Sequence, residues 1–493
     1  MPQFSRKNAI VYLGLAITLG CLALLAYQGV YNRFWADDWC YNADALHRGL
    51  IGAVQGYYDV TTYGSNRYSL TLFSGLMVPL GIPGIQLLPL AVIVLWSGGL
   101  YWNVRLLARL FKLPVDRPMS LLAAAMVVNV ALWLAPNQFQ DLLFRSAVLE
   151  YSAPLIGLTW LAGLGLRQAL PDRPAWPGLL EAGLLAFVVG GFAEVVCALM
   201  LAGLTLALLL VLLKTEFQTS TSTNHPRRLS RGSRRVVAIL GVALAGAGVA
   251  MLVLLLSPMN GPRRLASYGP PAPLDAVPLM ALKYSYYYIR AFLSINRWAV
   301  LALGAAGLLL GIAVPGGKVS LRQLLARLAG VAVPMYLLIA AVHVPTAYIE
   351  NAQLSEGRAL IVPAFVMVVG ILAGSWIAGM AVRNWRPEWV EQPRVWAVGL
   401  MLVLALAPLT FAASKYPAAL APISFFQKRA QFWDARDAAV RQAKAAGQMV
   451  VDVHAIDSYA GVIELYPQPN WVNNCAASYY GVDQILATLP WNP

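Results

Sequence analysis

The chain contains 493 residues, of which 59% are hydrophobic and only 12% are charged. Because soluble proteins carry about twice that fraction of charged residues, the composition excludes an ordinary soluble protein and indicates a polytopic membrane protein. The formal net charge is +14, but no basic stretch resembles a nucleic-acid-binding arm, and the cytoplasmic loops of membrane proteins are rich in Lys and Arg. We therefore expect the lipid bilayer, and no nucleic acid, as a partner.

Apolar stretches about 17 to 25 residues long predict the membrane spans. The first, Asn8 to Tyr31, follows Arg6 and Lys7 and is too long for the core of a signal peptide, so we interpret it as a retained span. Ten more are expected, which makes eleven, near residues 85–107, 118–135, 151–167, 177–192, 195–213, 236–256, 298–314, 328–342, 359–380 and 395–412. Alternate threading places more than half of the Lys and Arg residues in short loops on the side of the N-terminus. The positive-inside rule then assigns the N-terminus to the cytoplasm and the C-terminus to the outer face.

The apolar segment from Tyr68 to Leu80 is shorter than a span and ends at Gly81. Counting it as a span would place a cluster of Arg residues outside, so we interpret it as a half-inserted or surface helix of the first outer loop, residues 31–84. The sequence thus predicts an all-α transmembrane domain over residues 1–412.

Residues 413–493 are expected to form a small soluble region on the outer face. Phe425 to Ala446 is typical of an amphipathic, charged helix, and Met449 to Val453 of a buried strand. The region is too small for an elaborate catalytic domain, so we interpret it as a lid or an acceptor-docking element.

A stretch of ten residues after the first span, Asn32 to Tyr41, places Asp37 and Asp38 between Trp35 and Trp39. Adjacent carboxylates at the end of a span are costly to place, which favours the reactive end of a membrane enzyme. The alternative is that the two aspartates cap a helix and the aromatic residues form an interfacial belt. If a metal binds Asp37 and Asp38, paired carboxylates favour a hard divalent cation such as Mg²⁺ or Mn²⁺.

Two of the four cysteines, Cys21 and Cys197, lie in apolar runs, where Cys behaves as a small hydrophobic residue. The other two, Cys40 and Cys475, both fall on the outer face, where an oxidising compartment permits a disulfide between them. The four histidines form no recognised metal-ligand spacing.

Other polar side chains gather at the outer ends of the predicted spans. Glu194 lies within nearly continuous apolar sequence, so it should face a cavity or a partner, or reach water at a tight outer turn. Arg358 lies at the mouth of a span and could hold a phosphate, or pair with Glu356 or with lipid head groups. The remaining members of this set are Arg67, Asp141, Arg145, Glu150, Tyr151, Arg263, Arg264, Lys283 with its neighbouring tyrosines, Arg290, His343 and Glu350.

The arrangement resembles the GT-C-fold glycosyltransferases. The resemblance rests on the acidic pair Asp37-Asp38 after an N-in helix, on Arg67-Tyr68, and on Arg358 at the mouth of a late helix. It is closer to an uncharacterised bacterial branch with an Ala-Asp-Asp-Trp motif, a Tyr151-Ser152-Ala153-Pro154 segment and a Trp471-to-Cys475 ending. Oligosaccharyltransferase and protein mannosyltransferase signatures do not match.

This resemblance implies an inverting transfer of a sugar from a polyprenyl-phosphate carrier to a glycan, lipid or protein acceptor. The transfer would take place on the outer face of the bacterial cytoplasmic membrane. Asp37 or Asp38 would be the general base, and Arg358 would hold the leaving phosphate. The other candidate substrate-binding residues are Arg67, Glu194, Arg263 and Lys283.

Two other functions remain open. An O-antigen polymerase or ligase normally uses a large outer loop rich in Arg and His, and the loop 257–297 contains Arg but no His. A non-catalytic flippase or transporter of lipid-linked glycans should place ionisable residues near the middle of the membrane, and few of the predicted spans contain one.

Overall fold

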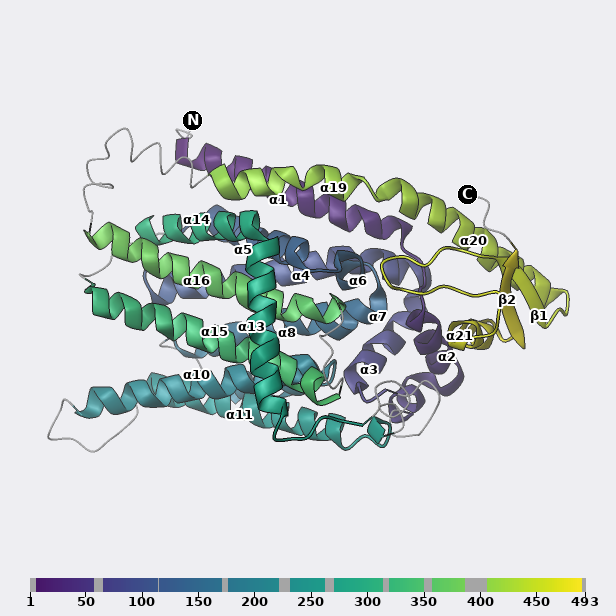
Figure 1. Ribbon diagram of the computed structural model, residues 1–493, viewed down its shortest axis with the longest axis horizontal. Helices are drawn as coiled ribbons and strands as arrows, with labels where there is room; N and C mark the ends of the chain where they lie inside the picture. Colours follow the sequence, from purple (N-terminus) through teal and green to yellow (C-terminus); the bar gives the residue numbers. More distant parts are fainter. Residues whose placement is uncertain are drawn as a thin grey trace.

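The computed structural model describes residues 6–56, 65–113, 115–170, 176–220, 231–261, 270–313, 319–349, 357–385 and 406–489. Long helices lie side by side in a bundle, and a small C-terminal region projects from one end of it (Figure 1). The long helices of the bundle are α1 (Arg6–Gln28), α4 (Gly81–Leu110), α5 (Arg117–Leu134), α8 (Ala153–Gln168), α9 (Trp176–Gly190), α10 (Glu194–Ser220), α11 (Arg231–Leu255), α14 (Arg297–Ala313), α15 (Leu321–Ile349) and α16 (Ile361–Trp385).

Other elements connect these helices. They are the 3₁₀ turn η1 (Gly29–Tyr31), α2 (Asp37–Gln55), α3 (Tyr68–Met77), the 3₁₀ turn η2 (Val78–Leu80), α6 (Gln138–Leu142), α7 (Arg145–Ala147), the π-helical turn η3 (Val148–Ser152), α13 (Val277–Ile295) and the 3₁₀ turn η4 (Gly357–Leu360). The short segment 68–80 therefore forms a separate helix, α3, which is joined to α4 through η2 and packs against α2.

Eight helices in the described part of the chain are long and apolar enough to cross a membrane, and nine if the bent pair of α13 and α14 is counted as one span. The chain is thus a helical multi-span membrane protein, with fewer qualifying spans than the eleven expected. The span near 177–192 corresponds to α9 and the one near 298–314 to α14, and both helices are too short to qualify alone. The part of the predicted span 395–412 up to residue 405 lies outside the described residues. Residues 406–414 are helical.

Small residues allow some helices to approach closely. α14 contains a Gly-x-x-x-Gly pair, Gly307 and Gly311, which faces Gly379 of α16. A Cβ atom on Gly311 would overlap the carbonyl oxygen of Trp376 and the backbone of Gly379. Close backbone packing of this kind replaces the hydrophobic driving force that is absent between helices in lipid.

The C-terminal region contains α19 (Tyr416–Leu420), α20 (Ile423–Ala445), β1 (Val450–His454), α21 (Trp471–Tyr480) and β2 (Gln484–Leu489). The predicted charged helix is confirmed as α20. β1 pairs in parallel with β2, with Val451 opposite Ile485. The predicted strand is present as β1, but it is buried on one face only: Val451 and Val453 are buried, whereas Val450 is 56% exposed.

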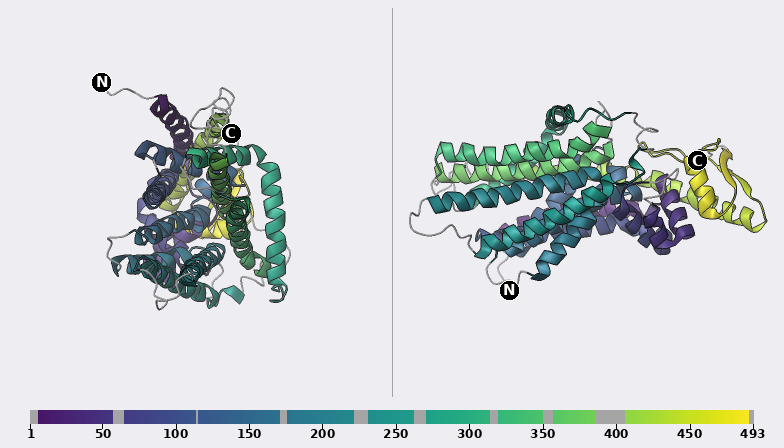
Figure 2. Two further views of the ribbon diagram at one scale, coloured as in Figure 1. Left: turned by 90° about the vertical axis from the view of Figure 1, so that its left-hand side faces the viewer. Right: turned by 90° about the horizontal axis from the view of Figure 1, so that it is seen from below.

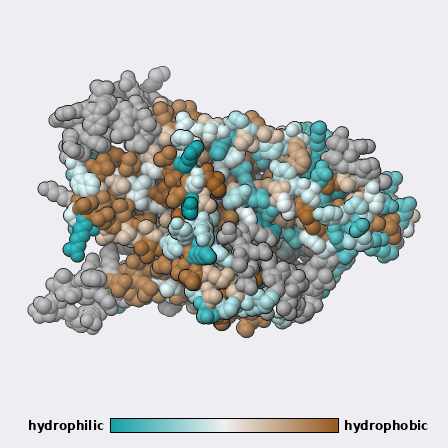
Figure 3. All heavy atoms as spheres, viewed as in Figure 1, coloured by the Kyte–Doolittle hydropathy of each residue, from teal (hydrophilic) through white to brown (hydrophobic). Residues whose placement is uncertain are grey.

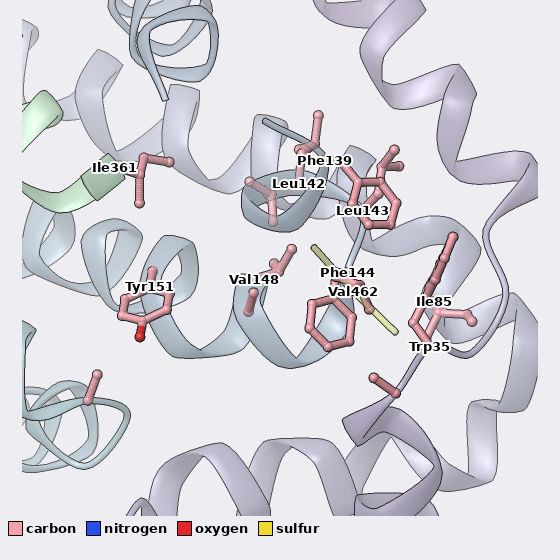
Figure 4. Close-up of a cluster of buried hydrophobic side chains, with 14 of the residues drawn as sticks. Trp35, Ile85, Phe139, Leu142, Leu143, Phe144, Val148, Tyr151, Ile361 and Val462 are labelled. Carbon is pink, nitrogen blue, oxygen red and sulfur yellow. The ribbon is translucent and has the colours of Figure 1, made fainter. Parts of the chain in front are cut away.

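One buried hydrophobic cluster connects the bundle to the C-terminal region. Figure 4 shows Trp35, Phe139 and Tyr151 in this cluster, with Val462 from the C-terminal region among them. The surface divides along the same axis: hydrophobic residues dominate the bundle, and hydrophilic residues dominate the end that carries the C-terminal region (Figure 3).

Candidate functional site

Asp37 and Asp38 are the first two residues of α2, at the end of the bundle that carries the C-terminal region. The cap position falls to Ala36, so neither aspartate occupies the position that the capping hypothesis assigned to it. Ala36 has φ of 27° and ψ of −107°, which is a strained conformation for a residue with a Cβ. Backbone strain of this kind persists only where the surroundings enforce it, and it is concentrated at functional sites.

The two carboxylates have different environments. Asp38 is 1% exposed, and its Oδ1 accepts hydrogen bonds from the Arg145 Nε at 3.3 Å and the Ser146 hydroxyl at 2.7 Å. The Arg145 guanidinium, also 1% exposed, donates to the Asn42 side chain at 2.7 Å and to the backbone oxygen of Asp38 at 2.9 Å. Burial raises the pKa of Asp38, and Arg145 and Ser146 act in the opposite direction. Asp38 is therefore a structural residue in this conformation, whereas Asp37 is only partly buried.

The aromatic residues of the same stretch do not form a membrane belt, because Trp35 and Trp39 are each 1% exposed. Trp39 stacks on Trp433 of α20 with 5.6 Å between ring centroids, and the Arg429 guanidinium lies over the Trp35 ring at 3.1 Å. These residues therefore attach the C-terminal region to the bundle.

Covalent and ionic contacts reinforce this attachment. A disulfide joins Cys40 to Cys475, the two cysteines for which the sequence permits a pairing, with Cα atoms 4.7 Å apart. Arg33 donates two hydrogen bonds to the Asp434 carboxylate, at 2.6 and 2.7 Å. The stretch that contains the acidic pair is thus held by residues about 400 positions away in the chain.

Within the C-terminal region, Glu464 is 1% exposed and forms ion pairs with Arg429 and Arg436, the latter at 3.0 Å. Arg429 also donates to the backbone oxygen of Phe34. This buried triad therefore extends the contact with the stretch before α2.

A second charged cluster joins three elements of the bundle. Arg67 lies 2.5 Å from Glu150 and 3.2 Å from Glu194, and Asn66 also donates to Glu194. Glu194 begins α10 at the tight turn after α9, and it has the partner that its apolar surroundings required. Glu150 belongs to the π-helical turn η3, and such turns occur frequently at functional sites.

A third group contains Asp141 of α6 and Arg358 of η4. Asp141 is fully buried, and within the described chain neither carboxylate oxygen has a hydrogen-bond partner. Burial raises the pKa of Asp141 well above its ordinary value, although the nearby Arg358 guanidinium acts in the opposite direction. A protonated Asp141 carries no charge, so it does not neutralise Arg358.

We expect the Asp141→Asn variant to be more thermally stable than the wild type at alkaline pH. The folded wild type keeps a proton on Asp141, whereas the unfolded chain releases it near pH 4. The free energy of unfolding of the wild type is therefore highest below pH 4. Above pH 4 it falls by about 1.4 kcal/mol per pH unit until the pH reaches the raised pKa of Asp141. Melting curves across pH in detergent test this. The exposed Asp483→Asn variant should follow the wild type, and parallel profiles for Asp141→Asn and wild type would show that Asp141 is ionised when folded.

The remaining predicted residues that the structure describes are not brought together with these groups. Lys283 is exposed on α13, with its Nζ 6.0 Å from the Tyr287 ring centroid. Arg263 lies outside the described residues, as do Arg264, Glu350 and Glu356. Among the residues that the structure places, no group of three or more His, Cys, Asp or Glu side chains could hold a metal ion. A Mg²⁺ or Mn²⁺ ion on Asp37 and Asp38 stays a prediction.

The sequence did not identify Arg145 as the partner of Asp38, nor Ser146 and Asn42 as members of this network. Arg145 was recognised only as a polar residue at the end of a span. Its distance of 107 positions from Asp38 gives no signal in a single sequence. No protein-family model and no curated protein matches the chain. The fold and the site thus define a class, the helical multi-span membrane proteins, and no family within it.

Proposed function

We propose that the protein is an inverting glycosyltransferase that takes a sugar from a polyprenyl-phosphate carrier. The acceptor would be a glycan, lipid or protein at the outer face of the bacterial cytoplasmic membrane. The observation that carries the proposal is the partly buried Asp37, which follows the strained Ala36 and adjoins the immobilised Asp38. A carboxylate held in this way is suited to accept a proton from a substrate hydroxyl.

The reaction needs a base and a positive charge. Asp37 would remove the proton from the acceptor hydroxyl while the oxygen of that hydroxyl bonds to the anomeric carbon. The bond from that carbon to the phosphate oxygen breaks, and the phosphate leaves with the electron pair. Arg358 would stabilise the charge on the leaving phosphate, and the neutral Asp141 beside it does not oppose this role.

The charge of the second cluster suits it to bind the sugar and not the phosphate. Arg67 contacts two carboxylates, Glu150 and Glu194, so the three side chains together are negative and unsuited to bind phosphate. Glu194, an acceptor of hydrogen bonds, remains suited to sugar hydroxyls. Arg358 is therefore a better phosphate ligand than Arg67 in this proposal.

The orientation has two supports. Positive residues favour a cytoplasmic N-terminus. The disulfide between Cys40 and Cys475 favours an oxidising compartment for α2 and the C-terminal region. Both favour the outer face of the membrane for Asp37.

A flippase for lipid-linked glycans is the second candidate. The observation in its favour is the set of partly buried ion pairs of Arg67 with Glu150 and Glu194, because a flippase could use charges at this end of the bundle as the entrance of a translocation path.

An assay in liposomes distinguishes the transferase from the flippase. The purified protein is supplied with a radiolabelled polyprenyl-phosphate sugar and with an acceptor fraction from the source membranes. A transferase moves the label from the lipid to the acceptor and releases polyprenyl phosphate. A flippase exposes the intact labelled lipid on the opposite leaflet. Intact lipid in every fraction, with no released polyprenyl phosphate, would contradict the transferase proposal.

A further inference from the structure

Helix α13 has an orientation that differs from those of the bundle helices. It turns by 88° into α14, and it runs across α15 and α16 instead of along them (Figure 1). The two other views agree: α13 lies at the periphery of the bundle, and it is seen end-on in one of them (Figure 2).

The inner face of α13 is fixed to the bundle. Tyr284, Tyr288 and Phe292 are buried, and the Tyr288 ring lies 5.9 Å from the ring of His343 in α15. The Tyr336 hydroxyl of α15 donates to the backbone oxygen of Leu282 at 2.8 Å. The helix is therefore held in this orientation by packing.

The outer face combines cations, aromatic rings and aliphatic side chains. Lys283 and Arg290 are exposed two turns apart, and Tyr286 and Tyr287 between them are 55% and 45% exposed. Arg297 continues the series beyond the bend and lies 5.6 Å from the exposed Trp298 ring. Residues 277–298 contain no Asp or Glu, so the face is purely cationic.

The position of α13 coincides with a boundary on the surface. Hydrophobic side chains cover the bundle on one side of it, and the hydrophilic surface that leads to the C-terminal region lies on the other (Figure 3). A line of hydrophilic residues follows α13 itself. Such a change in surface polarity is expected where the hydrocarbon layer of a membrane gives way to the head groups.

We propose that α13 lies flat in the head-group layer of the leaflet on the side of the C-terminal region, where Lys283, Arg290 and Arg297 bind the phosphates of anionic phospholipids. Tyr and Trp favour this depth, because each ring has an apolar body and a polar edge. Exposed Leu279 and Leu293 reach the hydrocarbon below. α13 then crosses no membrane, and α14 alone is the span of the bent pair.

Depth is measured with single fluorescent labels in the full chain in nanodiscs. The native cysteines do not compete, because Cys21 and Cys197 are buried and the other two form the disulfide. A label at Tyr287→Cys should be quenched best by a doxyl group high on the acyl chain. Leu209→Cys on α10 should respond to a deep doxyl group, and Gln431→Cys on α20 only to iodide. A Tyr287→Cys label that behaves like either reference would overturn the interfacial position.

Lipid selectivity is measured with the same Tyr287→Cys label in discs of phosphatidylglycerol and phosphatidylcholine. Attraction to an anionic surface strengthens binding about five-fold per Lys or Arg, so doxyl-phosphatidylglycerol should quench several-fold more than doxyl-phosphatidylcholine. The Lys283→Gln/Arg290→Gln/Arg297→Gln variant should reduce that ratio to about one. The matched control, Arg322→Gln/Arg327→Gln at the other end of α15, should keep it. Equal quenching by both lipids around the unmodified helix would refute the binding of anionic lipid.

Discussion

The Asp37→Asn variant is expected to lose about 100-fold or more of its sugar-transfer activity, which is the range for removing a general base. Asn has the shape of Asp but cannot accept the proton of the acceptor hydroxyl. Asp37 is only partly buried, so this substitution should leave the fold intact. The measurement is transfer per molecule of membrane-inserted protein, with the donor at saturation.

Two companion variants make the result specific. Asp44→Asn, on the same helix, loses only an exposed ion pair with Arg48 and should transfer normally. Asp38→Asn should lose protein in the membrane, because its carboxylate holds the buried Arg145. Normal transfer by Asp37→Asn at wild-type protein level would remove the base from the proposed mechanism.

Much of the fold follows from hydropathy, because bilayer thickness fixes how long an apolar helix must be. The first span, the helices α4 and α5, and the turn before Glu194 all lie close to their predicted positions. The sequence also permits the disulfide, because Cys40 and Cys475 are the only cysteines outside apolar runs. The local hydropathy pattern is enough to predict these helices, and the oxidising compartment is enough to predict that the disulfide can form.

Contacts between distant segments could not be predicted. The aromatic residues around Asp37 fit a membrane belt equally well in sequence, since a belt and a buried interface both use Trp and Tyr. In the structure they contact α20 and α21 instead: Trp39 packs against Trp433 of α20 and Tyr479 of α21, and Trp35 lies beneath Arg429 of α20. Helix α13 illustrates the same limit, because the sequence predicts only an outer loop over residues 257–297, whereas the structure has a helix there that packs against α15.

The Arg145→Met variant is expected to lower the free energy of unfolding by about 3–5 kcal/mol, the usual cost of leaving a buried charge without its partner. Asp38 is 1% exposed and would keep only uncharged donors, from Ser146 and from the Trp35 amide, and Asn42 would lose the guanidinium as well. Thermal and chemical unfolding in detergent measure the loss.

A double-mutant cycle separates the ion pair from simple damage to packing. Replacing the whole pair, Asp38→Asn with Arg145→Met, leaves no unpaired charge and should recover most of the lost stability. The exposed pair of Asp437 and Arg441 gives the matched control, because Arg441→Met removes a surface ion pair worth at most about 1 kcal/mol. A double variant that is no more stable than Arg145→Met would contradict this prediction. The guanidinium would then stabilise the fold by filling space, and Asp38 would need no positive partner to remain buried beside Asp37.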